Sequence, residues 1–150
     1  MKSRNYKKFI VMIVVSYIIM HIIMFFNIIE IQHYHTNISR IYMTLLMISA
    51  MAMVMILMMG KMYPDKKINM GIITVSVVVF GATLFALRGQ TPIGDVQYMK
   101  AMIPHHSSAI LTSERANIQD PEVKKLAEEI IKAQRKEIAE MEAMIEKSGQ

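Results

Sequence analysis

The chain has 150 residues, a net charge of +5, and 53% hydrophobic residues of which few are aromatic. This apolar content is too high for an ordinary soluble protein of one or two small domains. Because the chain contains no cysteine, disulfides and thiolate metal sites are excluded. Methionine, histidine and the carboxylates are then the strong metal ligands that remain.

Three long apolar stretches fill most of the N-terminal region, which we define as residues 1–89. Each is about 20 residues long, the length that a helix needs to cross the hydrocarbon core of a bilayer. We therefore expect three transmembrane helices, at about residues 9–30, 41–60 and 68–87. The first stretch follows a basic start, as in a signal peptide. It is longer than a signal core and no small-residue cleavage pattern follows it, so we interpret it as an uncleaved anchor.

Basic residues flank these stretches asymmetrically. The loop at residues 30–40 is neutral overall, whereas seven basic side chains lie before the first stretch or between the second and third: Lys2, Arg4, Lys7, Lys8, Lys61, Lys66 and Lys67. The positive-inside rule predicts a multi-pass protein of the cytoplasmic membrane, with its N-terminus inside and its C-terminal region outside. From residue 89 onward eight Lys and Arg face ten Asp and Glu. The basic excess therefore reflects membrane orientation, and a nucleic-acid partner is not expected.

Two helix-start signals follow the third apolar stretch. Thr91 and Asp120 are capping residues, and each precedes a proline, which is favoured at the first helical position. We expect one helix from there to about Asn117 and a second from Pro121 to about Lys147, joined by two to four residues. Such a short connection makes residues 90–150 an antiparallel hairpin. The predicted fold class is all-α, with three transmembrane helices followed by this hairpin.

Residue types that bind soft metals recur on the first hairpin helix. Asp95, Met99, Met102 and His106 are separated by steps of four, three and four residues, which places them on one helical stripe. The adjacent His105 points about 100° away from that stripe, so only one of the two histidines can face the second helix.

The second hairpin helix carries a matching stripe. Apolar residues alternate at intervals of three and four over residues 123–144, which indicates a buried seam, and Gln134, Glu137 and Met141 occupy positions in it. A buried carboxylate needs a partner. A hairpin that turns near residue 119 supplies partners by pairing His106 with Gln134, Met102 with Glu137, and Met99 with Met141.

This mixture of thioether, imidazole and carboxylate groups favours copper or silver over magnesium or calcium. Thioethers bind Cu(I), imidazole binds copper or zinc, and carboxylates favour harder ions. A di-iron centre requires Glu-x-x-His sequences, which the hairpin lacks. A single methionine is more often an adaptable core residue than a ligand. Pro104 removes one helical hydrogen bond, and it is either a tolerated kink or a device that aims the neighbouring histidines.

The two stripes and their separation resemble the domain-of-unknown-function family 305. The resemblance covers about residues 94–147 and rests on Asp95-x-x-Tyr98-Met99-x-x-Met102-Ile103-Pro104-His105-His106 and on Gln134-x-x-Glu137-Ile138-x-x-Met141. It implies an exported ferritin-like helical bundle that binds copper or confers copper tolerance, with Met99, Met102, His105, His106 and Met141 as ligands and with Asp95, Gln134 and Glu137 as supporting polar residues. Many members carry the hairpin twice. This chain carries it once, so we expect a homodimer that completes a four-helix bundle.

The sequence leaves three functions open. We expect a membrane-anchored, extracytoplasmic protein that sequesters Cu(I) or passes it to copper-handling proteins, without catalysis, since no nucleophile or cofactor loop is present. A transport accessory is the second, because the second apolar stretch carries a methionine stripe at residues 51–62 and His21 lies within the first. A structural membrane oligomer without metal is the third. His33 and His35, in the first loop, are weak candidates for metal capture.

Overall fold

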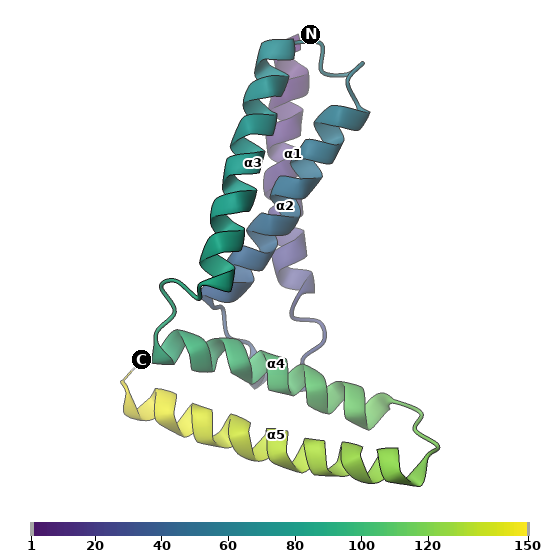
Figure 1. The fold of residues 1–150 in the computed structure, drawn as a ribbon, viewed down its shortest axis with the longest axis vertical. Coiled ribbons are helices and arrows are strands. Elements are labelled where there is room, and N and C mark those ends of the chain that lie inside the picture. The colour runs from purple at the N-terminus through teal and green to yellow at the C-terminus, as the bar shows by residue number, and fades with distance from the viewer. Residues whose placement is uncertain (1, 150) are drawn as a thin grey trace. The chain divides into compact units, whose positions relative to one another are not determined.

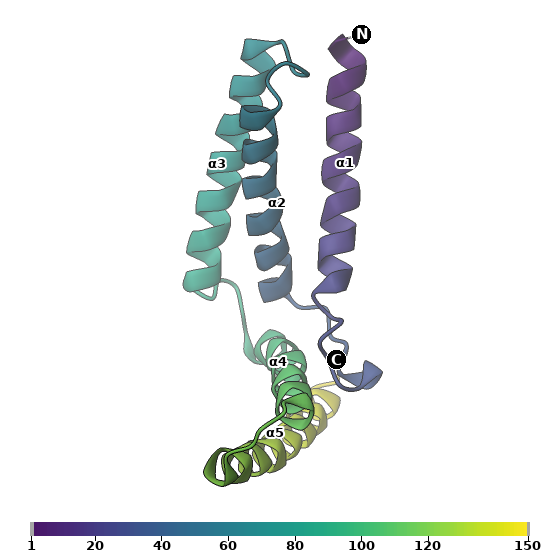
Figure 2. The same ribbon diagram turned by 90° about the vertical axis from the view of Figure 1, so that its right-hand side faces the viewer.

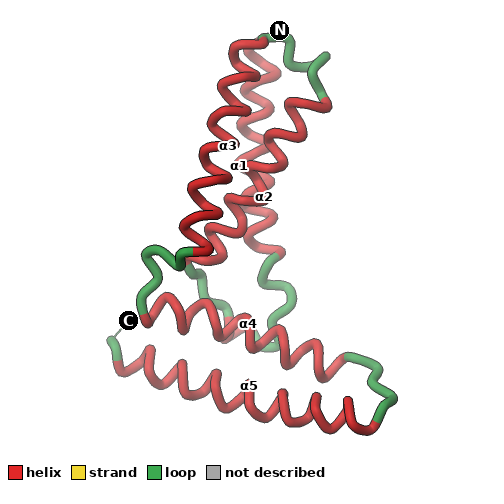
Figure 3. The backbone as a smooth tube through the Cα atoms, viewed as in Figure 1, coloured by secondary structure: helices red, strands yellow, loops and turns green. Residues whose placement is uncertain are grey.

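The structure is a computed structural model that describes residues 2–149. In this range the regular structure is helical, without a strand (Figure 3). Figure 1 shows the elements in chain order, namely α1 (Lys2–Ile23), the short 3-10 helix η1 (Ile31–His33), α2 (Ile38–Met58), α3 (Lys66–Arg88), α4 (Asp95–Arg115) and α5 (Pro121–Lys147). The predicted all-α fold, with three apolar helices followed by a hairpin, is confirmed.

The chain divides into two compact units. The first, here the apolar unit, comprises the chain up to Ile23 together with Ser39–Pro92. The second, here the hairpin unit, comprises Met24–Ile38 and the chain from Ile93 onward. The segment between α1 and α2 therefore packs with the hairpin, although about 55 residues separate the two along the chain. We call residues 24–38 the strap.

In the apolar unit, α1, α2 and α3 run alongside one another (Figure 2). Three segments are long and apolar enough to cross a membrane: Arg4–Ile23, Ile38–Met58 and Lys66–Arg88. In the most apolar 18 residues of each segment, only 11%, 28% and 11% of the residues are buried. Most of their apolar side chains therefore point outward, as contact with lipid requires. The helix α1 ends at Ile23 and not near residue 30, because the last part of the first apolar stretch belongs to the strap.

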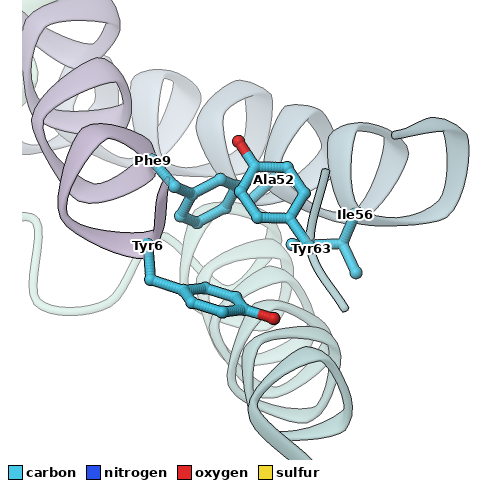
Figure 4. Close-up of a cluster of buried hydrophobic side chains, with 5 residues drawn as sticks. All are labelled: Tyr6, Phe9, Ala52, Ile56 and Tyr63. Carbon is cyan, nitrogen blue, oxygen red and sulfur yellow. The ribbon is translucent and has the colours of Figure 1, made fainter. Parts of the chain in front are cut away.

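An aromatic cluster joins one end of the three helices. Figure 4 shows its buried members, Tyr6, Phe9, Ala52, Ile56 and Tyr63. The hydroxyl of Tyr6 donates to Asn69 Oδ1 at 2.8 Å and accepts from the backbone N–H of Asp65 at 3.1 Å. The Asp65 carboxylate in turn caps α3 by accepting from the N–H groups of Lys67 and Ile68.

In the hairpin unit, α4 and α5 lie side by side and run in opposite directions (Figure 1). The N-cap of α5 is Asp120, as expected, and its carboxylate accepts from the N–H groups of Glu122 and Val123 at 2.8 and 3.1 Å. The expected start of α4 at Thr91 is wrong. Gly94 is the N-cap, and the helix begins at Asp95. The five residues that connect the helices exceed the predicted two to four.

The hairpin core consists of isoleucines from both helices: Ile103, Ile110, Ile138 and Ile145. Partly buried side chains of Ile29, Met99, Ile131 and Met141 pack against them. The predicted seam on α5 is therefore displaced, because Val123, Leu126 and Met144 are 49%, 56% and 56% exposed. Two apolar stripes lie next to each other on α5, and α4 packs against the one that presents isoleucines.

Candidate metal centre

A groove of about 280 Å³ lies between α4 and α5. Its lining consists of three methionines, a histidine, a tyrosine and two carboxylates: Tyr98, Met102, His106, Glu137, Glu140, Met141 and Met144. Four of the residues predicted from the sequence thus meet in one place, namely Met102, His106, Glu137 and Met141. Thioether, imidazole and carboxylate groups border the same open space.

The histidine and the glutamate are close neighbours within this groove. His106 Nδ1 lies 3.1 Å from Glu137 Oε2, which is within ion-pair distance. The two atoms are not aligned for a hydrogen bond, so Nδ1, which is buried, has no hydrogen-bond partner within the described part of the chain. The side chain of His106 is 12% exposed and that of Glu137 is 48% exposed. A buried nitrogen without a partner costs free energy unless something binds it.

Burial lowers the pKa of His106 below its ordinary value, and the neighbouring His105 lowers it further, while the charge of Glu137 opposes both effects. The imidazole is therefore more readily neutral than a free histidine. A neutral imidazole is the form that binds metals, because a protonated ring has no lone pair to donate.

The remaining predicted residues do not line the groove. Met99 packs against the isoleucine core, Gln134 is half-buried elsewhere on α5, Asp95 is exposed in the first turn of α4, and His105 is exposed. The predicted pairing of facing residues on the two helices is also wrong by about one turn, since His106 faces Glu137 and not Gln134. The connection between the helices begins and ends with extended residues, Ala116 and Asp120. Helical spacing does not predict the offset between two helices that such a connection joins.

Sequence reasoning missed three groups of the groove, Tyr98, Glu140 and Met144. A signal for Met144 existed, because it continues the intervals of three and four from Glu137 and Met141. The periodicity predicts a place for Met144 in the buried seam, whereas in the structure the residue is 56% exposed at the groove.

The histidines of the first loop are also placed differently from the expectation. His33 is 7% exposed, and its Nδ1 lies 2.9 Å from Ser107 Oγ. Burial lowers the pKa of His35, which Glu142 opposes. Both histidines are part of the hairpin unit, and neither lines the groove.

The methionine stripe of residues 51–62 is divided between α2 and the turn that follows it. The helix ends at Met58, so Met62 lies in the following turn, and the side chains of Met58 and Met62 are 80% and 47% exposed. His21 Nδ1 pairs with Thr44 Oγ1 at 3.1 Å, and the Thr44 hydroxyl donates to the carbonyl of Arg40. Because the hydroxyl proton is used there, His21 Nδ1 is the donor in its hydrogen bond with Thr44.

The donors that converge in the groove fit a soft metal. Within residues 2–149, no group of three or more His, Asp and Glu side chains is placed to hold a metal ion. The groove instead offers three thioethers and one imidazole with a carboxylate beside it. This set matches the preferences of Cu(I).

The sequence of the hairpin matches a known protein family. The sequence profile described as Domain of unknown function (DUF305) matches residues 95–150, which include both groove-lining helices. The uncharacterized protein L153 of Acanthamoeba polyphaga mimivirus is 35% identical over 112 residues, which span 73% of this chain and 72% of that protein. No solved structure matches the chain. Through its helical hairpin, the chain therefore belongs to the domain-of-unknown-function family 305.

Proposed function

We propose that the protein is a membrane-anchored Cu(I)-binding protein, without catalytic activity, that holds the ion in the groove between α4 and α5 and sequesters it or passes it to copper-handling proteins. The observation that carries this proposal is that His106, whose buried Nδ1 makes no aligned hydrogen bond, lines the same groove as three methionines. Thioether and imidazole ligands bind Cu(I) without any thiolate, in keeping with a chain that has no cysteine.

The orientation of the hairpin unit is part of the proposal. The strap follows one membrane-type helix, and the hairpin follows three, so both emerge on the same side if each helix crosses the bilayer. Their packing into one compact unit agrees with three crossings. The basic residues of the N-terminus and of the α2–α3 connection favour the cytoplasmic side for those segments, which supports a groove outside the cytoplasm.

The test is a Cu(I) titration of the full chain in nanodiscs, with a chromophoric chelator as competitor. Met102→Leu removes a thioether from the groove while keeping a side chain of similar size, and His106→Gln removes the imidazole. We expect each change to weaken Cu(I) binding by about tenfold or more, because each removes a ligand.

Met99→Leu is the matched control, since Met99 lies on the same helix but packs in the isoleucine core. It should leave the affinity nearly unchanged. Equal losses for Met99→Leu and Met102→Leu would remove the groove as the site, and unchanged binding in Met102→Leu and His106→Gln would refute the proposal.

We further propose that a second copy of the chain covers the flank of α5 that carries the groove. The apolar side chains Val123, Leu126 and Ile130 are 49%, 56% and 36% exposed, and helical spacing puts them on the same flank as Glu137 and Met144. A core of four isoleucines is small for an independent unit, and a second hairpin would add the missing apolar layer. The result would be a four-helix bundle.

Leu126→Lys tests this pairing by placing a charge in the apolar stripe. Glu129→Lys, on an exposed position of the same helix away from the stripe, is its control. Native mass spectrometry in detergent should give a dimer for the unmodified chain and for Glu129→Lys, and a monomer for Leu126→Lys. A monomeric unmodified chain contradicts the pairing.

A further inference from the structure

Pro104 leaves a backbone acceptor open in the middle of α4. Proline has no N–H, so the carbonyl of Lys100, four residues earlier, loses its helical donor. In the structure the side-chain amide of Asn37 donates to this carbonyl at 3.2 Å. The same amide also donates to the carbonyl of His35 at 3.1 Å, and Asn37 is only 2% exposed. A strap side chain thus takes the position of the missing helical hydrogen bond.

The strap also forms hydrogen bonds with the turn of α4 that follows Pro104. Ser107, which is fully buried, accepts a hydrogen bond from the backbone N–H of Ile29 at 2.8 Å. Its hydroxyl also lies 2.9 Å from Nδ1 of the buried His33. A hydroxyl can accept two hydrogen bonds and donate one, so Ser107 satisfies the N–H of Ile29 and the Nδ1 of His33 together.

Further hydrogen bonds join the strap to α4 on both sides of these contacts. The amide of Asn27 donates to Ser108 Oγ at 2.8 Å, and the backbone N–H of Ile38 donates to Gln97 Oε1 at 3.2 Å. The side chain of Ile29 packs against the isoleucine core. The strap therefore contributes to the core and fills polar positions on α4, as a part of a folded unit does and a surface loop does not.

We propose that the strap is an integral part of the hairpin unit and that Pro104 and Asn37 act as a pair, in which the proline opens a backbone acceptor and the asparagine fills it. The family's matching region begins at residue 95, so the strap lies outside it. In this chain the backbone enters the hairpin unit after α1, leaves it at the start of α2, and enters it again after α3. The strap therefore connects the hairpin unit to α1 and α2, in addition to the connection from α3.

A double-mutant cycle on the full chain in nanodiscs tests the pair. Asn37→Ala leaves the partly buried carbonyl of Lys100 without its side-chain donor, and we expect about tenfold faster hydrogen exchange in the peptides of α4 around Pro104. In a Pro104→Ala background, residue 104 regains an N–H that donates to Lys100. Asn37→Ala should then accelerate exchange by about twofold or less, because the helix supplies the bond itself.

Gln32→Ala is the matched control, since Gln32 is an exposed amide side chain of the strap. It should not change exchange in α4. Equal accelerations by Asn37→Ala in the two backgrounds would overturn the pairing, and so would an effect of Gln32→Ala as large as that of Asn37→Ala.

A second variant keeps the inference testable if Pro104→Ala does not accumulate. Asn37→Asp preserves the size of the side chain but replaces its donor by an oxygen. We expect exchange at least as fast as in Asn37→Ala, because two acceptors then face each other. Exchange like that of the unmodified chain would show that Asn37 acts by filling space and not by donating, and would refute the proposal.

Discussion

Replacing Ser107 by alanine gives a sharp test of how the strap stabilises the hairpin unit. The hydroxyl is fully buried, and it satisfies both the backbone N–H of Ile29 and the Nδ1 of His33. Ser107→Ala leaves two polar groups without partners. Each such group costs on the order of 1 to 3 kcal/mol, and we expect a loss of about 3 kcal/mol in local stability.

The neighbouring residue supplies the control. Ser108→Ala makes the same chemical change one position later, but the hydrogen bond that it removes, from Asn27, is exposed. Water can replace an exposed partner, so the expected loss is about 0.5 kcal/mol.

Hydrogen exchange of the full chain in nanodiscs measures both variants in the same peptides. In the strap and the facing part of α4, Ser107→Ala should accelerate exchange about a hundredfold, and Ser108→Ala about twofold. Similar accelerations for the two variants would refute the reasoning, because they would mean that the buried position of Ser107 does not matter. So would an effect of Ser107→Ala that is absent from the strap.

Three further predictions concern pH, the aromatic cluster and a helix cap. Burial lowers the pKa of His35 and His106, so below about pH 6.5 the unfolded chain binds more protons than the folded one. The folded state is therefore most stable above that pH, and its stability declines as the pH falls toward the folded pKa values. Thermal melts of the metal-free protein should give a lower melting temperature at pH 5.5 than at pH 7.5. Replacement of both histidines by glutamine should reduce this difference in melting temperature. Tyr6→Phe removes the hydrogen bond to Asn69 and should destabilise the apolar unit by about 1 to 2 kcal/mol in thermal melts, so an unchanged melting temperature would count against that bond. Asp120→Ala removes the cap of α5 and should cost about 1 kcal/mol, seen as faster exchange in the first turn of α5, whereas Asp120→Asn keeps a capping oxygen and should be nearly silent.

Several elements of this protein follow from its sequence alone because their causes are local. The lengths of the apolar stretches predict three membrane-type helices, and Asp120 before Pro121 predicts the start of α5. The spacing of Met102 and His106 places them on one stripe of α4. These features depend on residues within a few turns of one another, which helical periodicity relates directly.

The tertiary structure decided which stripes meet and what else joins them. Helical spacing fixes neither the rotation of α5 about its axis nor its offset along α4, so the seam and the partner of His106 were displaced from their predicted positions. The strap was beyond sequence reasoning for a related reason. Its hydrogen bonds to Ser107 join residues more than 70 positions apart, and only the folded unit shows that the carbonyl opened by Pro104 lies beside Asn37.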